Sequence, residues 1–178
     1  MRIDKTQKIE LCASRDETRA SLNYLHLDVE AKRLVATDNY RLVVLPCDVD
    51  PADVSGPIPV DVLKDARRIA GKSGDVFVAS LKDECRLLNG ATYPKPDVEA
   101  FPKYKSVLVD YDETPGTVTI GINARYLWEM AQALGATKDA ANVMITVPVP
   151  SEGQQSRDPI QVRRPNADGV GVLMQVRL

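Results

Sequence analysis

The chain has 178 residues, of which 44% are hydrophobic and 27% charged, an ordinary composition for one medium folded domain or two small ones. Its formal net charge of -2 excludes a protein that coats nucleic acid with a uniformly basic surface, so any DNA contact must come from a local basic face. The three cysteines are widely spaced without a CxxC pair, which argues against a disulfide framework and a zinc site. We expect a cytoplasmic protein without membrane contact, because the sequence has no long apolar run and no signal peptide.

The first part of the sequence predicts a β-meander. Residues 8–13 have the pattern of a short strand, and residues 24–30 alternate strictly between apolar and polar side chains, as a half-buried strand does. Residues 34–37 and 41–49 predict two further strands with a tight polar turn between them. Connections this short favour antiparallel neighbours.

A helix is predicted at residues 60–70, where apolar side chains recur at helical spacing and Gly71 supplies the stop. Its predicted buried stripe consists of Val62, Leu63, Ala66, Ile69 and Ala70. Residues 75–81 and 84–90 then predict a hairpin. The prolines of residues 91–107 predict a partly extended loop.

The second part of the sequence, after a linker at residues 110–117, again predicts a strand, a helix and more strands. The strand is at 118–122, and the helix at about 124–135 has Asn123 as its N-cap. Its predicted buried face consists of Tyr126, Leu127, Met130, Ala131 and Leu134. The later strands are predicted at 142–149, 159–164 and 170–178.

The order strand, helix, strands therefore occurs twice, in segments of low identity that share one plan. Such an order is also compatible with a parallel doubly wound sheet. The many adjacent hairpins favour an α+β fold of antiparallel sheets with helices packed on one face. We expect two domains, at residues 1–109 and 110–178.

Five segments resemble the bacterial DNA polymerase III beta subunit, the DNA sliding clamp, in the order of that family. LVATDNYRLVV (34–44) is similar to the family pattern V-A-T-D-G/S-H/Y-R-L, and AFPKYKSVL (100–108) to F-P-D-Y-x-x-V. PVDVLKDARRI (59–69) stands where the family has its next helix. IGINARYLWEMAQAL (120–134) resembles G-F-N-x-x-Y-L-x-x-x-L, and VLMQVRL (172–178) resembles the clamp ending V-V-M-P-M-R-L.

The resemblance covers about half of a clamp subunit. It likens residues 1–109 to the middle clamp domain without its first helix, and residues 110–178 to the second half of the last domain. The family's first domain has no counterpart. Asn39 stands where the family has glycine or serine, and Gln175 where it has proline. The surfaces that close a clamp ring therefore cannot be carried over.

The resemblance implies a non-enzymatic scaffold that encircles double-stranded DNA through non-specific backbone contacts and recruits replication or repair proteins. Recruitment in the family uses a hydrophobic pocket that accepts a short extended peptide. The resemblance assigns this peptide-binding pocket to Thr37, Asn39, Tyr40, Arg41, Leu42, Pro102, Ser106, Val107, Asn123, Tyr126, Pro159, Ile160, Val172, Leu173, Met174, Gln175, Val176, Arg177 and Leu178. It also implies that the turn at 37–42 and the tail lie side by side. The plain alternative for the apolar members is that they are core residues.

The helix at 60–70 carries a basic face that could meet DNA phosphates, which require positive charge but no sequence reading. The residues of this face are Lys64, Arg67, Arg68 and Lys72. Asp61 and Asp65 partly offset their charge. The alternative, which we favour, is a solvated helix face with internal charge pairs.

Catalytic, metal and cofactor motifs are absent from the sequence, and His26 is its one histidine, so we expect no catalytic residues, no metal and no cofactor. The leading hypothesis is a reduced sliding clamp that assembles as a homo-oligomer around DNA. The second is an adaptor or decoy that binds clamp-partner peptides without a ring, as a phage or mobile element could carry. An unrelated α+β enzyme ranks last.

Overall fold

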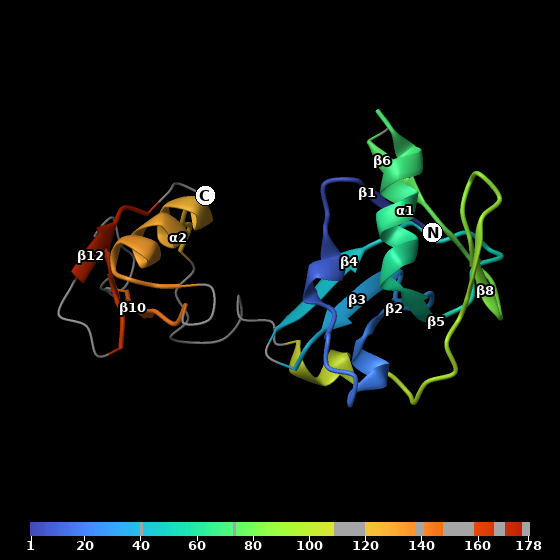
Figure 1. The fold of residues 1–178 in the computed structure, drawn as a ribbon, viewed down its shortest axis with the longest axis horizontal. Coiled ribbons are helices and arrows are strands. Elements are labelled where there is room, and N and C mark those ends of the chain that lie inside the picture. The colour runs from blue at the N-terminus through green and yellow to red at the C-terminus, as the bar shows by residue number, and fades with distance from the viewer. Residues whose placement is uncertain are drawn as a thin grey trace, which may run out of the picture. The chain divides into compact units, whose positions relative to one another are not determined.

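The computed structural model describes residues 1–39, 41–72, 74–108, 120–137, 141–147, 159–165 and 170–175. The chain consists of two compact units, Met1–Leu108 and Val109–Leu178, and we describe each by itself (Figure 1). In each unit the described strands pair antiparallel and an α-helix packs against them, so the α+β fold is confirmed. The assignment of each unit to a particular clamp domain stays a prediction.

The first unit is built on a four-stranded antiparallel sheet in the order β4-β3-β2-β5. Its strands are β2 (Tyr24–Asp28), β3 (Arg33–Thr37), β4 (Leu42–Pro46) and β5 (Gly56–Pro59). The predicted meander is thus confirmed. The alternation in β2 has the expected result: Leu25 and Leu27 are fully buried on one face, while Tyr24, His26 and Asp28 lie on the other.

Helix α1 (Val60–Ala70) has the predicted bounds and closes the core on the Leu25 and Leu27 face. Val62, Leu63 and Ala66 are buried in the same core cluster, whereas Ile69 is partly exposed and does not belong to the buried stripe. The helix ends at Gly71, whose φ of 54° is in the left-handed region that glycine adopts without steric cost.

The smaller strands of this unit form two further antiparallel sheets. One joins β1 (Arg2–Asp4) to β6 (Asp75–Phe77). The other joins β7 (Ala79–Ser80), β8 (Glu84–Arg86) and β9 (Thr92–Pro94). The predicted hairpin is correct only for β7 and β8, because the segment 75–81 divides at Val78 and its first half pairs with β1 instead.

The strand predicted at residues 8–13 is wrong, because this segment forms the 3₁₀-helix η1 (Ile9–Cys12). Ile9 is buried and Cys12 partly buried, whereas Leu11 is largely exposed. A spacing of three residues places two side chains on one face of a 3₁₀-helix but not of a strand. A second short 3₁₀-helix, η2 (Ala20–Leu22), follows, and a third, η3 (Tyr104–Val107), comes near the end of the unit.

The described part of the second unit contains α2 (Ala124–Ala133) and a three-stranded antiparallel sheet in the order β10-β11-β12. These strands are β10 (Met144–Thr146), β11 (Ile160–Arg163) and β12 (Val170–Leu173). The predicted cap is confirmed, since Asn123 Oδ1 accepts hydrogen bonds from the backbone N–H groups of Arg125 and Tyr126, at 3.0 and 3.3 Å.

Two predictions for the second unit need correction. Tyr126 was assigned to the buried face of the helix but is about half exposed, and Ala131 is the fully buried member of that face. The strand predicted at 118–122 partly falls outside the described residues, and within 120–122 only Gly121 makes a bridge. The core here is formed by Ile160, Val162 and Leu173, with the apolar face of α2 packed against them.

Candidate peptide-binding site

The turn between β3 and β4 is held by a dense set of local hydrogen bonds. The Thr37 hydroxyl donates to the Arg41 carbonyl at 2.8 Å and accepts from the Asn39 N–H at 3.1 Å. The Asp38 carboxylate accepts from the Arg41 N–H at 3.1 Å. Asn39 has a φ of 73°, a conformation that asparagine tolerates better than most residues, which explains how it can replace glycine or serine here.

Two contacts hold the Arg41 side chain at the edge of this turn. Its Nε lies 2.9 Å from Asp38 Oδ2, and its Nη2 donates to the carbonyl of Leu11 in η1 at 2.9 Å. The side chain nevertheless stays 59% exposed, so the guanidinium faces solvent with part of its charge compensated. An arginine held at two points loses little further freedom when it binds an anion.

Residues 101–108, which we call the strap, run against the polar face of the four-stranded sheet. The Phe101 ring stacks on His26 of β2, with centroids 4.9 Å apart and an interplanar angle of 10°. Three residues further on, the Tyr104 hydroxyl donates to Asp28 Oδ2 at 2.8 Å. Lys105 Nζ lies 2.9 Å from the same oxygen. The two aromatic residues of the AFPKY motif therefore fasten the strap to alternate residues of one strand.

The pKa shifts in this network reflect the contacts of Asp28. Burial alone raises the pKa of the Asp28 carboxyl, but hydrogen bonds from the Ala31 N–H, Lys105 and Tyr104 outweigh it and lower the pKa to about 2. Burial, followed by the hydrogen bond to this carboxylate, raises the pKa of Tyr104 to about 12. Asp28 is thus a stable anion that anchors the strap over the physiological pH range.

A cavity of about 480 Å³ lies between the turn and the strap, within the size range of small-ligand sites. The apolar part of its lining comes from Leu42, Pro102, Leu108 and the Tyr104 ring. Its complete lining is Thr37, Asn39, Arg41, Leu42, Pro102, Lys103, Tyr104 and Leu108. The first unit by itself therefore forms a cavity with an apolar wall and a polar rim.

Five residues predicted for the peptide pocket line this cavity: Thr37, Asn39, Arg41, Leu42 and Pro102. Sequence reasoning missed Lys103, Tyr104 and Leu108, although all three lie inside the motif 100–108 that carried the resemblance. Ser106 does not line the cavity, and its hydroxyl donates to the Lys103 carbonyl at 2.8 Å inside the strap. Tyr40 lies outside the described residues, and of Val107 only the backbone, in η3, is described.

The other predicted pocket residues belong to the second unit. In the core of the second unit, Ile160 is fully buried and Leu173 is nearly so. This supports the alternative that these two are core residues. Pro159, Tyr126, Val172 and Met174 are exposed, Gln175 is partly exposed, and Asn123 caps α2. Val176, Arg177 and Leu178 lie outside the described residues. That the turn at 37–42 lies beside the tail stays a prediction.

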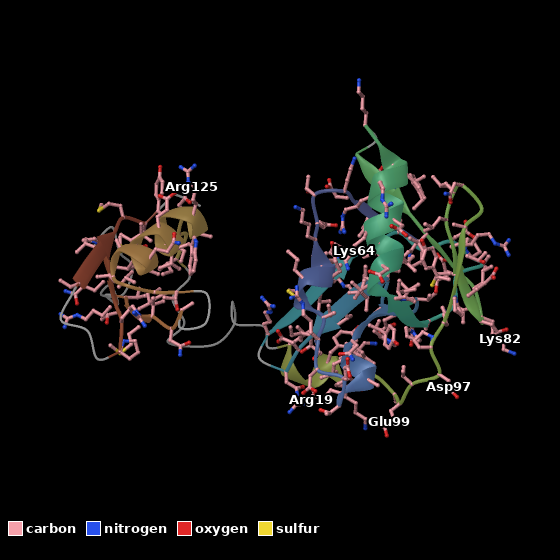
Figure 2. All side chains as sticks on the ribbon, viewed as in Figure 1. Arg19, Lys64, Lys82, Asp97, Glu99 and Arg125 are labelled. Atoms are coloured by element: carbon pink, nitrogen blue, oxygen red, sulfur yellow. The ribbon has the colours of Figure 1, made fainter. Side chains whose placement is uncertain are left out.

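The basic face of α1 is largely paired within the helix. Lys64 Nζ lies 2.8 Å from Asp61, and Arg68 forms an ion pair with Asp65, so the predicted offsetting of charge is present. Lys64 is labelled on α1 in Figure 2. Lys72 is exposed just beyond the helix.

Arg67 does not belong to this basic face. Its guanidinium donates to the carbonyls of Lys5 and Gln7 and forms an ion pair with Glu10. The side chains of this pair are only 12% and 8% exposed. Arg67 therefore fastens the segment before β2 to α1, and this placement argues against a phosphate contact.

The side chains that commonly bind metal ions do not cluster in the part of the chain that the structure describes. No group of three or more His, Cys, Asp or Glu side chains there could hold a metal ion. Burial raises the pKa of the Cys47 and Cys85 thiols to about 11, so neither is a thiolate near neutral pH. None of the described helices has the length and apolar character of a membrane span.

The chain has the fold of the bacterial DNA polymerase sliding clamps, as its similarity to their solved structures shows, and this confirms the predicted resemblance at the level of fold. The chain is similar to the sliding clamp of Pseudomonas aeruginosa, with a TM-score of 0.66 and 17% identity, over 98% of this chain and 50% of that clamp. For the Bacillus subtilis clamp the TM-score is 0.64 and the identity 18%, over 99% and 49% of the two chains.

The clamp of Caulobacter crescentus gives a TM-score of 0.62 and 20% identity, over 98% of this chain and 50% of that clamp. The chain thus spans about half the length of the solved clamps it matches. No protein-family model and no curated protein matches the sequence.

Proposed function

We propose that this protein is a non-enzymatic, clamp-like scaffold whose first unit captures a short extended peptide from a replication or repair protein. The observation that carries the proposal is the cavity between the turn and the strap, where Leu42, Pro102 and Leu108 present an apolar wall. A short peptide gains affinity by placing one or two apolar side chains in such a site, while polar groups at the rim fix its direction.

The strap supports this role because it is fixed before any peptide arrives. Its two anchors, Phe101 on His26 and Tyr104 on Asp28, hold the backbone that carries Pro102 and Leu108. A preformed wall avoids the entropy cost of ordering a loop when the peptide binds.

Fluorescence anisotropy with a labelled clamp-binding peptide tests the proposal directly. Leu108 is 51% exposed, so Leu108→Glu places a charge in the apolar wall without disturbing the core, and we expect at least a tenfold loss of affinity. Leu88→Glu is the matched control, since Leu88 is 72% exposed in the same unit away from this cavity. The proposal fails if the unaltered protein does not bind the peptide, or if both variants bind it equally well.

The second candidate function is a ring that encircles DNA, which the shared fold with sliding clamps favours. Since the chain spans about half of those clamps, such a ring needs more copies or a different interface. The phosphate contacts would come from Lys64, Arg68 and Lys72 rather than from the buried Arg67. Native mass and retention on closed circular DNA test this candidate, and a monomer that is never retained excludes it.

A further inference from the structure

We infer that His26 is a positioning residue for the peptide site, because its neutral ring holds the strap in place and its protonated ring releases it. Peptide affinity should therefore fall when the pH is lowered from 7.5 to 5.5. This control by pH rests on the proposed peptide-binding role. It acts through one contact, the stack between His26 of β2 and Phe101 at the start of the strap.

The stack couples His26 to the wall of the cavity. The two ring centroids lie 4.9 Å apart with an interplanar angle of 10°, which is an offset-stacked arrangement. Phe101 directly precedes Pro102, which lines the cavity. The His26 ring makes no hydrogen bond with the described residues, so stacking is what joins it to the strap. A change in the charge of this ring therefore acts on Pro102 through the backbone of Phe101.

The surroundings of His26 disfavour its protonated form. Burial lowers the pKa of His26 below its ordinary value of 6.5. The charge of Asp28 opposes this, whereas the charges of Lys95 and Lys105 add to it. The Asp28 carboxylate already accepts from the Tyr104 hydroxyl at 2.8 Å and lies 2.9 Å from Lys105 Nζ. A protonated imidazole has two N–H donors, and the carboxylate on its own face of β2 is already occupied by other donors.

The elements packed around His26 bring few other anions to its ring. The neighbouring strand β5 has no ionisable side chain. The ionisable groups that the other neighbours contribute are Arg33 of β3, Tyr24 of β2 itself, Lys95 and the exposed Asp97 and Glu99 before the strap, and Lys103, Tyr104 and Lys105 within it. An imidazolium would gain attraction from the Phe101 ring, but this recovers only part of the hydration that burial removes.

The pH window of the effect follows from these directions. The pKa of His26 is lowered while the strap is docked, so docking is favoured fully above pH 6.5 and is weakened as the pH falls below that value. The pKa of Asp28 is about 2, so Asp28 stays ionised throughout the interval and the Tyr104 anchor remains. Between pH 7.5 and 5.5 the titration therefore changes the Phe101 anchor of the strap and not the Tyr104 anchor.

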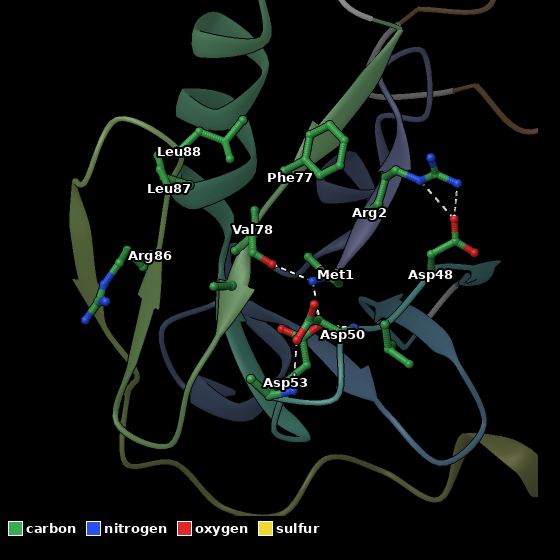
Figure 3. A pocket seen from close by; sticks show the side chains of 13 residues that line it. Met1, Arg2, Asp48, Asp50, Asp53, Phe77, Val78, Arg86, Leu87 and Leu88 are labelled. Atoms are coloured by element: carbon green, nitrogen blue, oxygen red, sulfur yellow. Dashed lines mark hydrogen bonds and ion pairs between the residues drawn. The ribbon is translucent and has the colours of Figure 1, made fainter.

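The larger cavity of the same unit, of about 570 Å³, offers a comparison within the protein, since neither His26 nor the strap lines it. Figure 3 shows the Met1 amine there, which donates to Asp53 Oδ2 at 2.5 Å and to the Val78 carbonyl at 2.6 Å. Arg2 Nε donates to Asp48 at 2.9 Å. Asp48→Asn alters this cavity and leaves the contacts of the strap in place, so it serves as the control variant.

The experiment measures fluorescence anisotropy of a labelled clamp-binding peptide without ionisable side chains, at pH 7.5 and 5.5 and constant ionic strength. We expect the affinity of the unaltered protein to fall by about threefold at the lower pH, because a smaller fraction of the protein has its strap docked. His26→Phe keeps a ring that can stack on Phe101 but cannot be protonated, so its affinities at the two pH values should agree within about 1.5-fold. Asp48→Asn should show the same fall as the unaltered protein.

Proton NMR gives a second measurement that requires no variant. His26 is the one histidine of the 178 residues, so its imidazole signals are assigned without ambiguity. By linkage, a peptide that prefers the neutral ring must lower the pKa of His26 when it binds.

Four outcomes contradict the role of His26 or the function on which it rests. Equal affinity of the unaltered protein at the two pH values, or a His26 pKa that the peptide does not change, overturns the inference and leaves the proposed function standing. If His26→Phe retains the full fall, another group carries the pH dependence and the inference is wrong. If no peptide binds at pH 7.5, the proposed function fails and the inference fails with it.

Discussion

Among the residues that the structure describes, the first unit has a larger buried apolar cluster than the second. In the first unit one core cluster extends from Met1 to Leu87 and includes side chains from the sheet, from α1 and from the smaller strands. In the described part of the second unit the buried cluster consists of Ile160, Val162 and Leu173. Several large apolar side chains there are exposed: Trp128, Met144, Ile145, Val170, Val172 and Met174.

This difference indicates where the stability of the protein resides. A smaller folded unit buries a smaller share of its surface, and buried apolar area is the main favourable term in folding. We therefore expect the first unit to unfold at a higher urea concentration than the second. The protein contains a single tryptophan, Trp128 in α2, so its fluorescence reports on the second unit alone.

The largest expected effect comes from truncating a core leucine in the first unit. Leu63→Ala removes a fully buried side chain and should destabilise that unit by about 3 kcal/mol, as cavity-forming leucine substitutions do. Circular dichroism should show an earlier transition, while the Trp128 fluorescence transition stays in place. Leu173→Ala is the counterpart in the second unit and should move the fluorescence transition. If Leu63→Ala shifts both signals equally, the two units unfold together and the predicted difference in their stability is wrong.

A smaller effect is expected from the buried ion pair between α1 and η1. Arg67→Ala leaves the Glu10 carboxylate without its charged partner in a site where its side chain is 8% exposed. We expect a loss of about 2 kcal/mol, somewhat less than for a completely buried pair. Arg68→Ala is the control, because the Arg68 side chain is mostly exposed and its loss should cost less than about 0.5 kcal/mol. Urea titrations that give equal losses for the two variants would contradict the structural role of Arg67.

The contrast between Arg67 and Arg68 shows how far sequence reasoning extends. Helical spacing predicted both ends of α1, and strict alternation predicted β2 and the meander, because these patterns depend on neighbours along the chain. The partner of Arg67 is 57 residues away in the sequence, and no local pattern distinguishes it from Arg68. The same holds for the two strands into which residues 75–81 divide, since the partner of β6 is β1.

The candidate site was predictable to a similar extent. The turn and Pro102 could be assigned because the motifs themselves carry them. Lys103, Tyr104 and Leu108 were missed, although they follow Pro102 closely. Their place in the lining depends on how the strap docks onto β2 through Phe101 and Tyr104. The docking partners are far away in the sequence: Tyr104 and Asp28, for example, are 76 residues apart. Tertiary docking of this kind leaves no periodic signal in the sequence.

The anchoring of the strap gives a pH-dependent prediction for the first unit. The pKa of Asp28 in the folded protein is about 2, below its ordinary value of 3.8. The ionised carboxylate therefore stabilises the first unit, and this stabilisation is fully present above about pH 5. That contribution is lost as the pH falls through 4 toward 2. Asp28→Asn should therefore cost about 1 kcal/mol at pH 7, with a gap to the unaltered protein that closes toward pH 2.

The control for this prediction is Asp97→Asn, which changes an exposed carboxylate of the same unit (Figure 2). This variant should differ from the unaltered protein by less than about 0.5 kcal/mol at every pH. Urea titrations at pH 7, 4 and 2.5 measure the difference in free energy of unfolding between each variant and the unaltered protein. A gap for Asp28→Asn that is the same at all three values would mean that the ionised carboxylate does not hold the strap.

The smallest effects are expected from substitutions of the exposed apolar side chains of the second unit. Val172 and Met174 are 55% and 62% exposed, so Val172→Thr and Met174→Gln should each change the stability reported by Trp128 by less than about 0.5 kcal/mol. Measurement at two protein concentrations, tenfold apart, separates two cases. If the stability of neither variant depends on protein concentration, no second copy of the chain covers these two side chains. If the substitutions cost more than about 1 kcal/mol and the cost grows with protein concentration, these side chains are covered by another copy, which adds to the stability of this unit.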